Sequence, residues 1–160
     1  MIKNIIIIFL TLLPVISKST CLGKTPEKSA ENVFNNYRDF YLNIDNRILS
    51  EDFFNILEKE AKCRNEDICA IDSDQWLEAQ DGEIIKLKKI EMSNKSNHEA
   101  KIIVHFPYKM GGPEQIKSTT LIFTKPESTE CWVLSDLIGQ DYGSLKQSLI
   151  RWHEKYNQEP

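Results

Sequence analysis

The chain has 160 residues, of which 41% are hydrophobic, 28% charged and 9% aromatic. This composition is typical of soluble globular proteins and excludes disordered or fibrous classes. The first twenty residues hold two lysines and no acid, so the remaining chain carries 18 basic against 24 acidic side chains, a net charge of −6. With this acidic balance and no run of lysine or arginine, we expect no nucleic-acid partner.

The N-terminus has the pattern of a secretory signal peptide. A short positive segment, residues 1–4, precedes the apolar run 5–16, and small polar residues follow. Twelve helical residues span about 18 Å, less than the hydrocarbon core of about 30 Å. We therefore expect residues 1–20 to be a signal peptide rather than a buried helix, and residues 21–160 to form a single domain in the periplasm or envelope, with no transmembrane segment.

Cys21 raises the alternative of a lipid anchor. Bacterial lipoproteins place a cysteine directly after the apolar run, usually preceded by leucine and small residues. Here Lys18, Ser19 and Thr20 precede Cys21, which departs from that pattern. A lipid anchor at Cys21 is therefore the less favoured alternative.

The four cysteines favour disulfides, because an exported chain meets an oxidising compartment. Cys63 and Cys69 flank five residues that are typical of a loop, and we expect a bridge between them. Cys21 and Cys131 would then either pair or stay free. A zinc site is less favoured, since there is no CxxC pair and no histidine at ligand spacing.

Helical spacing predicts three amphipathic helices. Thr25-Pro26 has the N-cap and first-position pattern of a helix start, and the apolar spacing continues to about residue 43. Ser50 begins a second helix that ends near Cys63. Ser144 and Gln147 form a capping box for a terminal helix. Its apolar face is expected to hold Leu145, Leu149, Trp152 and Tyr156.

Between the second and third helices the apolar period changes from 3.6 to 2. Four strands are predicted, over residues 83–92, 99–107, 116–124 and 130–137, each separated by a turn. The third of these turns contains Pro126. Short turns between alternating strands indicate an antiparallel meander, and helices gathered on one side of it indicate the α+β class.

Three segments carry a resemblance to a known family. They are Tyr37-Arg38-Asp39-Phe40-Tyr41-Leu42, the acidic stretch Asp72–Asp81, and Trp132-Val133-Leu134 followed by Ser144-Leu145. In this order, over about residues 28–152, they resemble an uncharacterised domain family of bacterial exported or envelope proteins. The element order likewise resembles the cystatin-like cone fold of nuclear transport factor 2 and scytalone dehydratase. The resemblance implies a helix packed on a curved antiparallel sheet. It implies no activity, since that superfamily includes enzymes, small-molecule binders and immunity proteins.

The acidic stretch is the first candidate site. An EF-hand beginning at Asp72 would need glycine where Leu77 stands, so calcium binding is not favoured. The stretch is expected to be a solvated loop whose aspartates cap turns, or a surface that attracts a basic partner. The candidate partner- or ligand-binding residues are Tyr37, Tyr41, Asp72, Asp74, Trp76 and Asp81.

No catalytic residue, metal site or cofactor is predicted. His98 lies in a turn, His105 on the strand face opposite Val104 and Phe106, and His153 beside the apolar stripe of the terminal helix. All three are expected at the surface, and no known catalytic fingerprint occurs. Most aromatic residues fall at core spacing, which favours a plain core over a ligand cavity.

These observations predict an exported, non-enzymatic binding protein whose partner is a protein with a basic surface. Its most specific form is an immunity-type role, neutralising a toxin delivered to the envelope. One alternative is a small-ligand carrier or enzyme that uses the cone pocket. Another is a structural envelope lipoprotein.

Overall fold

The structure, a computed structural model, describes residues 21–64 and 69–156. The predicted signal peptide therefore lies outside the described residues. The elements, in chain order, are α1 (Pro26–Asn36), α2 (Glu51–Arg64), β1 (Glu83–Ile84), β2 (Lys89–Lys95), β3 (Glu99–Lys109), β4 (Gln115–Thr124), β5 (Val133–Ile138) and α3 (Leu145–Tyr156). The α+β prediction is confirmed.

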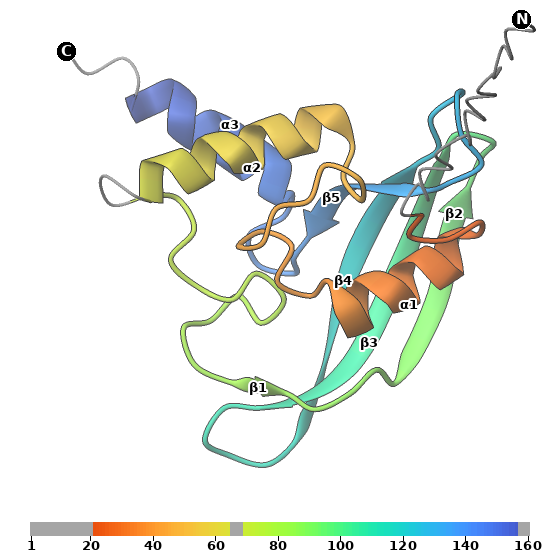
Figure 1. Ribbon diagram of the computed structural model, residues 1–160. Coiled ribbons are helices and arrows are strands. Elements are labelled where there is room, and N and C mark those ends of the chain that lie inside the picture. The colour runs from red at the N-terminus through yellow and green to blue at the C-terminus, as the bar shows by residue number, and fades with distance from the viewer. Residues whose placement is uncertain (1–20, 65–68, 157–160) are drawn as a thin grey trace, which may run out of the picture.

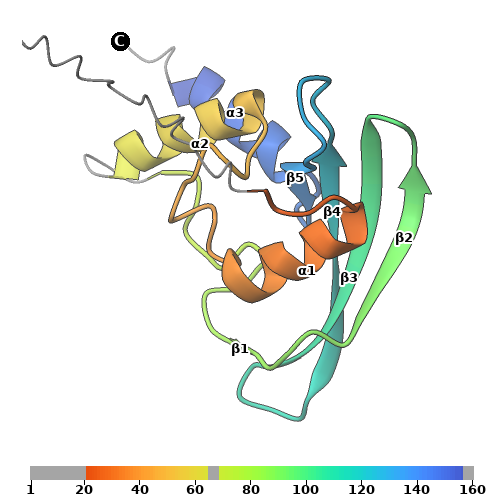
Figure 2. The same cartoon turned by 45° about the vertical axis from the view of Figure 1, so that its right-hand side comes forward.

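The sheet is antiparallel throughout and is built around β3. One edge of β3 pairs with β4, and its other edge pairs with both β1 and β2; β5 continues the sheet beyond β4. The long strands curl, and α1 lies across the inner face of the curl (Figure 1). Helices α2 and α3 lie side by side next to β5, away from β2 (Figure 2). No helix among the described residues has the length and apolarity needed to cross a bilayer.

The alternation in β3 positions the core. Ala100, Ile102, Val104 and Phe106 face inward and are at most 1% exposed. They pack with α1, whose inner face is likewise buried. The alternation that predicted this strand is confirmed, because successive side chains of a strand point to opposite faces.

The first helix is shorter than predicted. Its start is as expected, with Thr25 Oγ1 accepting a hydrogen bond from the backbone N–H of Lys28 at 3.3 Å, but it ends at Asn36 instead of near residue 43. Two successive asparagines are poor helix formers. Beyond them, turns rather than helix bring Phe40 and Tyr41 into the core.

The predicted strand 83–92 is also wrong in detail, because it is split into β1 and β2. Ile84 pairs with Tyr108 and Lys89 with His105, so four residues of this segment face only two of β3. Pro107 lies at the interruption. Its carbonyl accepts from Ile85 at 3.0 Å, but proline offers no N–H to continue the ladder.

The apolar face of α3 is rotated from the predicted one. Leu145, Leu149 and His153 are buried, whereas Tyr156 is 49% exposed. The surface position predicted for His153 is therefore wrong. Its Nε2 lies 2.9 Å from Oε2 of Glu60 in α2, and neither side chain is more than 5% exposed. A buried carboxylate partner explains why this histidine occupies a core position.

Candidate functional site

Residues 72–81 form a loop, here called the acidic loop, between the Cys69 disulfide and β1. Asp74 closes its central turn, since its Oδ1 accepts hydrogen bonds from the backbone N–H groups of Trp76 at 2.8 Å and Leu77 at 2.9 Å. A further backbone bond joins Asp74 N–H to the carbonyl of Ala79 at 3.0 Å. The predicted turn-capping role is therefore confirmed for Asp74.

Trp76 anchors the acidic loop in the core. Its side chain is 0% exposed, and its ring meets Phe34 and Phe106 with centroids 5.5 and 6.0 Å apart. The indole Nε1–H donates to the carbonyl of Arg38 at 2.7 Å, in the turn after α1. Trp76, a predicted binding residue, is therefore a core residue, and the exposed surface of the acidic loop comes from its neighbours.

Glu78 fixes the far end of the acidic loop. Its carboxylate accepts hydrogen bonds from the backbone N–H groups of Gln140 at 3.1 Å, Asp141 at 2.9 Å and Tyr142 at 2.8 Å. Its Oε2 also lies 2.8 Å from Nζ of Lys117. Burial raises the pKa of Glu78, but the hydrogen bonds from Lys117 and the loop amides outweigh it, so the pKa lies below its ordinary value. We call this arrangement the Glu78 latch.

The backbone around the Glu78 latch is shaped for this contact. Glu78 has a φ of 53°, a left-handed conformation that is strained for a residue with a side chain. Opposite it, a Cβ on Gly139 would lie 1.9 Å from Oε1 of Glu78. Lys117 Nζ also donates to the carbonyl of Leu77 at 2.7 Å. The latch therefore depends on a glycine on one side and a buried lysine on the other.

A cavity of about 550 Å³ opens between the acidic loop, the β5–α3 connection and the first turns of α3. We call it the acidic cavity, because Asp72, Glu78 and Asp141 are its charged lining residues and all are acidic. Lys117 neutralises Glu78 at 2.8 Å and lies 3.6 Å from Asp141. The apolar wall of the acidic cavity is formed by Ala70, Leu137, Leu145 and Leu149.

A second cavity, of about 630 Å³, lies between the turn after α1 and the β1–β2 connection. We call it the tyrosine groove, after Tyr41. Its rim includes two large exposed apolar side chains, Leu42 at 53% and Ile85 at 38%. Its charged lining residues balance in sign; they are Arg38, Asp39, Asp74 and Lys86.

The phenol of Tyr41 is held in its neutral form. Burial, with a further contribution from the Asp74 carboxylate, raises the pKa of Tyr41 to about 12. The phenol is therefore un-ionised at neutral pH, as an ordinary tyrosine also is, and the raised pKa reflects its burial beside Asp74.

The structure divides the predicted site residues among several places. Asp72 lines the acidic cavity, whereas Tyr41 and Asp74 line the tyrosine groove. Tyr37 packs half-buried against the core, and Asp81 is exposed; neither belongs to the two linings. The core residue Trp76 connects the two halves of the acidic loop.

Sequence reasoning missed the part of the acidic cavity that comes from the β5–α3 connection. Asp141 and Tyr142 are at least sixty residues from the acidic loop, and the hydrophobic pattern of neither segment indicates that the two segments meet. The nearest signal is the pair Gly139 and Gly143, which bracket this connection; Gly143 has a φ of 72°. Two glycines so close indicate a tight turn, but they do not identify what the turn faces.

On the outer face of the sheet, the side chains of Ser118, His105 and Glu91 lie in a row across β4, β3 and β2. Ser118 Oγ lies 2.7 Å from Nδ1 of His105, and Nε2 of His105 lies 3.7 Å from Oε2 of Glu91. Glu91 is paired more closely with Lys89, at 2.6 Å. Ser118 and His105 are direct cross-strand partners, and neither lines the two cavities above. We interpret the row as a polar ladder that stabilises the sheet.

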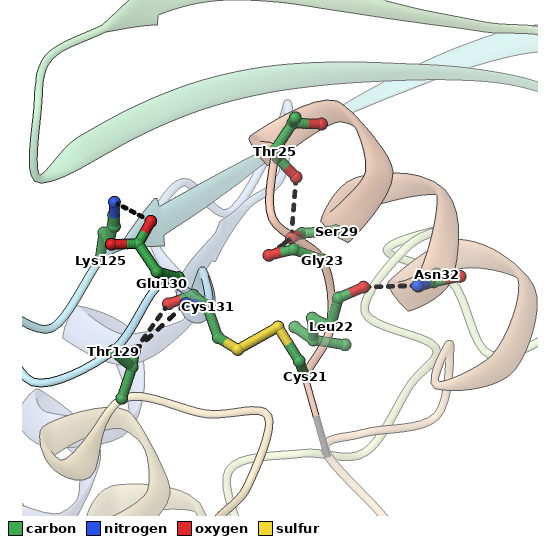
Figure 3. Close-up of a disulfide and its surroundings, with 10 residues drawn as sticks. All are labelled: Cys21, Leu22, Gly23, Thr25, Ser29, Asn32, Lys125, Thr129, Glu130 and Cys131. Carbon is green, nitrogen blue, oxygen red and sulfur yellow. Dashed lines mark hydrogen bonds and ion pairs between the residues drawn. A yellow bond between two sulfur atoms is a disulfide. The ribbon is translucent and has the colours of Figure 1, made fainter. Parts of the chain in front are cut away.

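Both disulfides are formed. The predicted Cys63–Cys69 bridge is confirmed, with Cα atoms 5.9 Å apart, and Cys21 pairs with Cys131 at a Cα distance of 5.4 Å. The second bridge holds the chain before α1 against the β4–β5 connection (Figure 3). Beside it, the N–H of Trp132 donates to the carbonyl of Gly23 at 3.1 Å.

Within the described ranges, no group of three or more histidine, cysteine, aspartate or glutamate side chains is placed to hold a metal ion. The chain matches no known protein-family model, and no curated protein and no solved structure is significantly similar to it.

Proposed function

We propose that this chain is an exported, non-enzymatic binding protein of the periplasm or envelope, and that its partner is a protein with a basic surface. The observation that carries the proposal is the acidic cavity, whose charged lining residues are all acidic. Complementary charge around a recessed site speeds association and fixes the orientation of a partner. In its most specific form, the partner is a toxin that reaches the envelope and is neutralised by this chain.

The disulfides support an extracytoplasmic location, because disulfides persist in oxidising compartments. The bond between Cys21 and Cys131 also bears on the lipoprotein alternative. A sulfur atom in a disulfide cannot carry a thioether-linked lipid at the same time. The structure therefore supports a protein that is released after export over one anchored at Cys21.

We also propose that α1 and the curled sheet form a cystatin-like cone. Support comes from the position of α1 across the inner face of the long strands (Figure 2). The space between them is filled by Phe34, Trp76 and Phe106, whose rings are in mutual contact. This filling favours recognition at the outer cavities over a ligand held inside the cone.

A second candidate, a small-ligand carrier, is favoured by the volume of the acidic cavity. About 550 Å³ lies within the range of roughly 300–1,000 Å³ that small-molecule sites occupy. Such a carrier would use the acidic cavity instead of the filled cone interior.

The proposal is tested by capturing envelope proteins of the producing cell on the immobilised mature chain. Three forms are compared: the wild type, D72N/D141N, and the control E114Q/E127Q, which removes two exposed charges from remote turns. We expect a basic protein to bind the wild type and the control, to elute with salt, and to be lost from D72N/D141N. Equal recovery on all three forms, or recovery of no specific protein, would contradict the proposal.

A further inference from the structure

The acidic cavity also indicates which chemical group it receives, an inference that rests on the proposed function. We infer that the cavity takes one arginine or lysine side chain of the partner. The aliphatic stem lies against the leucine wall, and the cationic tip lies toward the carboxylates of Asp72 and Asp141. Four observations support the inference: the apolar wall of the cavity, its acidic side chains, the exposed ring of Tyr142, and the hydrogen bonds that order the segments around the cavity.

The wall matches the stem of a long basic side chain. Leu137, Leu145 and Leu149 are 2%, 6% and 1% exposed, so they form a fixed but narrow apolar floor, which the half-buried Ala70 extends. A purely cationic ligand such as a metal ion gains nothing from such a floor. Lysine and arginine, in contrast, bury their methylene groups along apolar surface while the charged end stays near polar groups.

The charges match the tip. Asp72 is exposed, and the side chain of Asp141 is 72% exposed, so both carboxylates are accessible from solvent. Glu78 contributes little, since it already accepts three backbone hydrogen bonds and pairs with Lys117. Lys117 offsets part of this charge, since its Nζ lies 2.8 Å from Glu78 and 3.6 Å from Asp141, but the three lining carboxylates still outnumber it.

Tyr142 provides an aromatic contact beside these carboxylates. Tyr142 is one of the cavity's lining residues and is 62% exposed, so its ring is accessible from solvent. An ammonium or guanidinium over a tyrosine face gains cation–π attraction. The backbone N–H of Tyr142 is meanwhile held by Glu78 at 2.8 Å, so the ring is presented from a fixed loop.

The segments that surround the acidic cavity are held in place by hydrogen bonds within the protein, before any ligand binds. The Glu78 latch joins the acidic loop to the β5–α3 connection. On the other side, the buried Asp136 accepts from the N–H of Lys146 at 3.0 Å and fixes the first turn of α3. A preformed site loses little conformational entropy on binding.

The test uses NMR on the isotope-labelled mature chain with three probes: N-acetyl-arginine amide, N-acetyl-lysine amide, and N-acetyl-citrulline amide, which has the shape of the arginine probe without its charge. We expect the two charged probes to shift the amide signals of Gly139, Tyr142 and Gly143, and the citrulline probe to bind about tenfold more weakly or not at all. D72N/D141N should bind the arginine probe about tenfold more weakly than the wild type, whereas E114Q/E127Q should bind it as the wild type does.

The aromatic contribution is separated with Tyr142 variants. Y142A should bind the arginine probe severalfold more weakly than the wild type. Y142F should bind it nearly as well as the wild type, because phenylalanine keeps the ring face. The amide spectrum of each variant reports directly that it is folded.

Three outcomes would overturn the inference. They are equal binding of the citrulline and arginine probes, shifts confined to residues outside the acidic cavity, and no shifts at all. Each leaves the proposed function testable by itself, because a basic protein could still be captured through Asp72 and Asp141 without inserting a single side chain into the cavity. Loss of capture together with binding of the charged probes would instead indicate a small cationic ligand.

Discussion

At the scale of the residue, the carboxylate of Glu78 joins three segments that are far apart in the sequence. It belongs to the acidic loop, pairs with Lys117 of β4, and accepts backbone hydrogen bonds from the β5–α3 connection. A carboxylate with only 2% of its side chain exposed is stable in its charged form when several donors surround it. The position of the acidic loop therefore depends on this one group.

We expect E78Q to lower the free energy of unfolding by about 1–3 kcal/mol, because the neutral amide weakens each charge-assisted bond and leaves Lys117 less compensated. The control is D81N, which removes an exposed charge from the same loop and should change stability by less than about 0.5 kcal/mol. Urea denaturation followed by circular dichroism measures both. Equal stability of E78Q and the wild type would show that the latch is not stabilising.

The same group predicts a dependence on pH. The pKa of Glu78 in the folded chain lies below its ordinary value of 4.5. The stabilisation is therefore complete above the unfolded pKa and is lost as the pH falls through the folded pKa. Denaturation midpoints of the wild type and E78Q between pH 3 and pH 7 should converge on acidification. A gap that is constant across this range would contradict the prediction.

The buried pair of Glu60 and His153 gives a second prediction for single residues. Glu60 Oε1 also accepts from the backbone N–H of Ile71 at 2.7 Å, so the pair connects α2, α3 and the chain after the Cys69 disulfide. H153L leaves a buried carboxylate without its partner and should cost about 3–5 kcal/mol. The double variant E60Q/H153L should be more stable than H153L, because glutamine removes the charge and still accepts from Ile71. A double variant less stable than H153L would contradict this explanation.

At the scale of the element, the sequence predicts a helix or strand correctly where the structure of that segment depends on its own residues. The caps at Thr25 and Ser144 are in place, and the alternation in β3 identifies its buried face. These features depend on neighbouring residues alone.

The prediction is wrong or incomplete where the structure of a segment depends on a residue that is distant in the sequence. The turn after Asn36 is stabilised when Trp76 donates to the carbonyl of Arg38, and His153 is buried because Glu60 lies opposite. The acidic cavity likewise forms where the acidic loop meets the β5–α3 connection. The sequence shows each of these segments, but the contact between them is a property of the folded chain.

The Trp76 contact can be tested as a link between elements. W76F keeps an aromatic ring but removes the N–H that donates to the carbonyl of Arg38, and it also leaves a void. We expect a loss of about 2–4 kcal/mol and faster hydrogen exchange at Phe40, whose N–H donates to Tyr37 in the same turn. The control is W152F, since Trp152 is half-buried and stacks on Tyr156 at the surface of α3. Similar losses in the two variants would contradict a special role for Trp76.

At the scale of the whole molecule, the two disulfides differ in the length of chain that they close. Cys63–Cys69 spans a sequence separation of 6, whereas Cys21–Cys131 spans 110 and connects the start of the described chain to the β4–β5 connection. In the chain-entropy description, a longer closed loop removes more freedom from the unfolded state. That description gives ~4.8 kcal/mol for the long loop and ~2.2 kcal/mol for the short one.

We therefore expect C21S/C131S to be destabilised by about 2.6 kcal/mol more than C63S/C69S. Urea denaturation of the two double variants, with the wild type measured under oxidising and reducing conditions, checks the difference. A free-thiol assay of the unfolded wild type confirms that all four cysteines are paired before reduction. If C63S/C69S proves the less stable variant, the short bridge stabilises the folded state through local packing beside Glu60, and loop entropy does not determine the order. The result therefore decides whether the long disulfide is the principal covalent constraint on the fold.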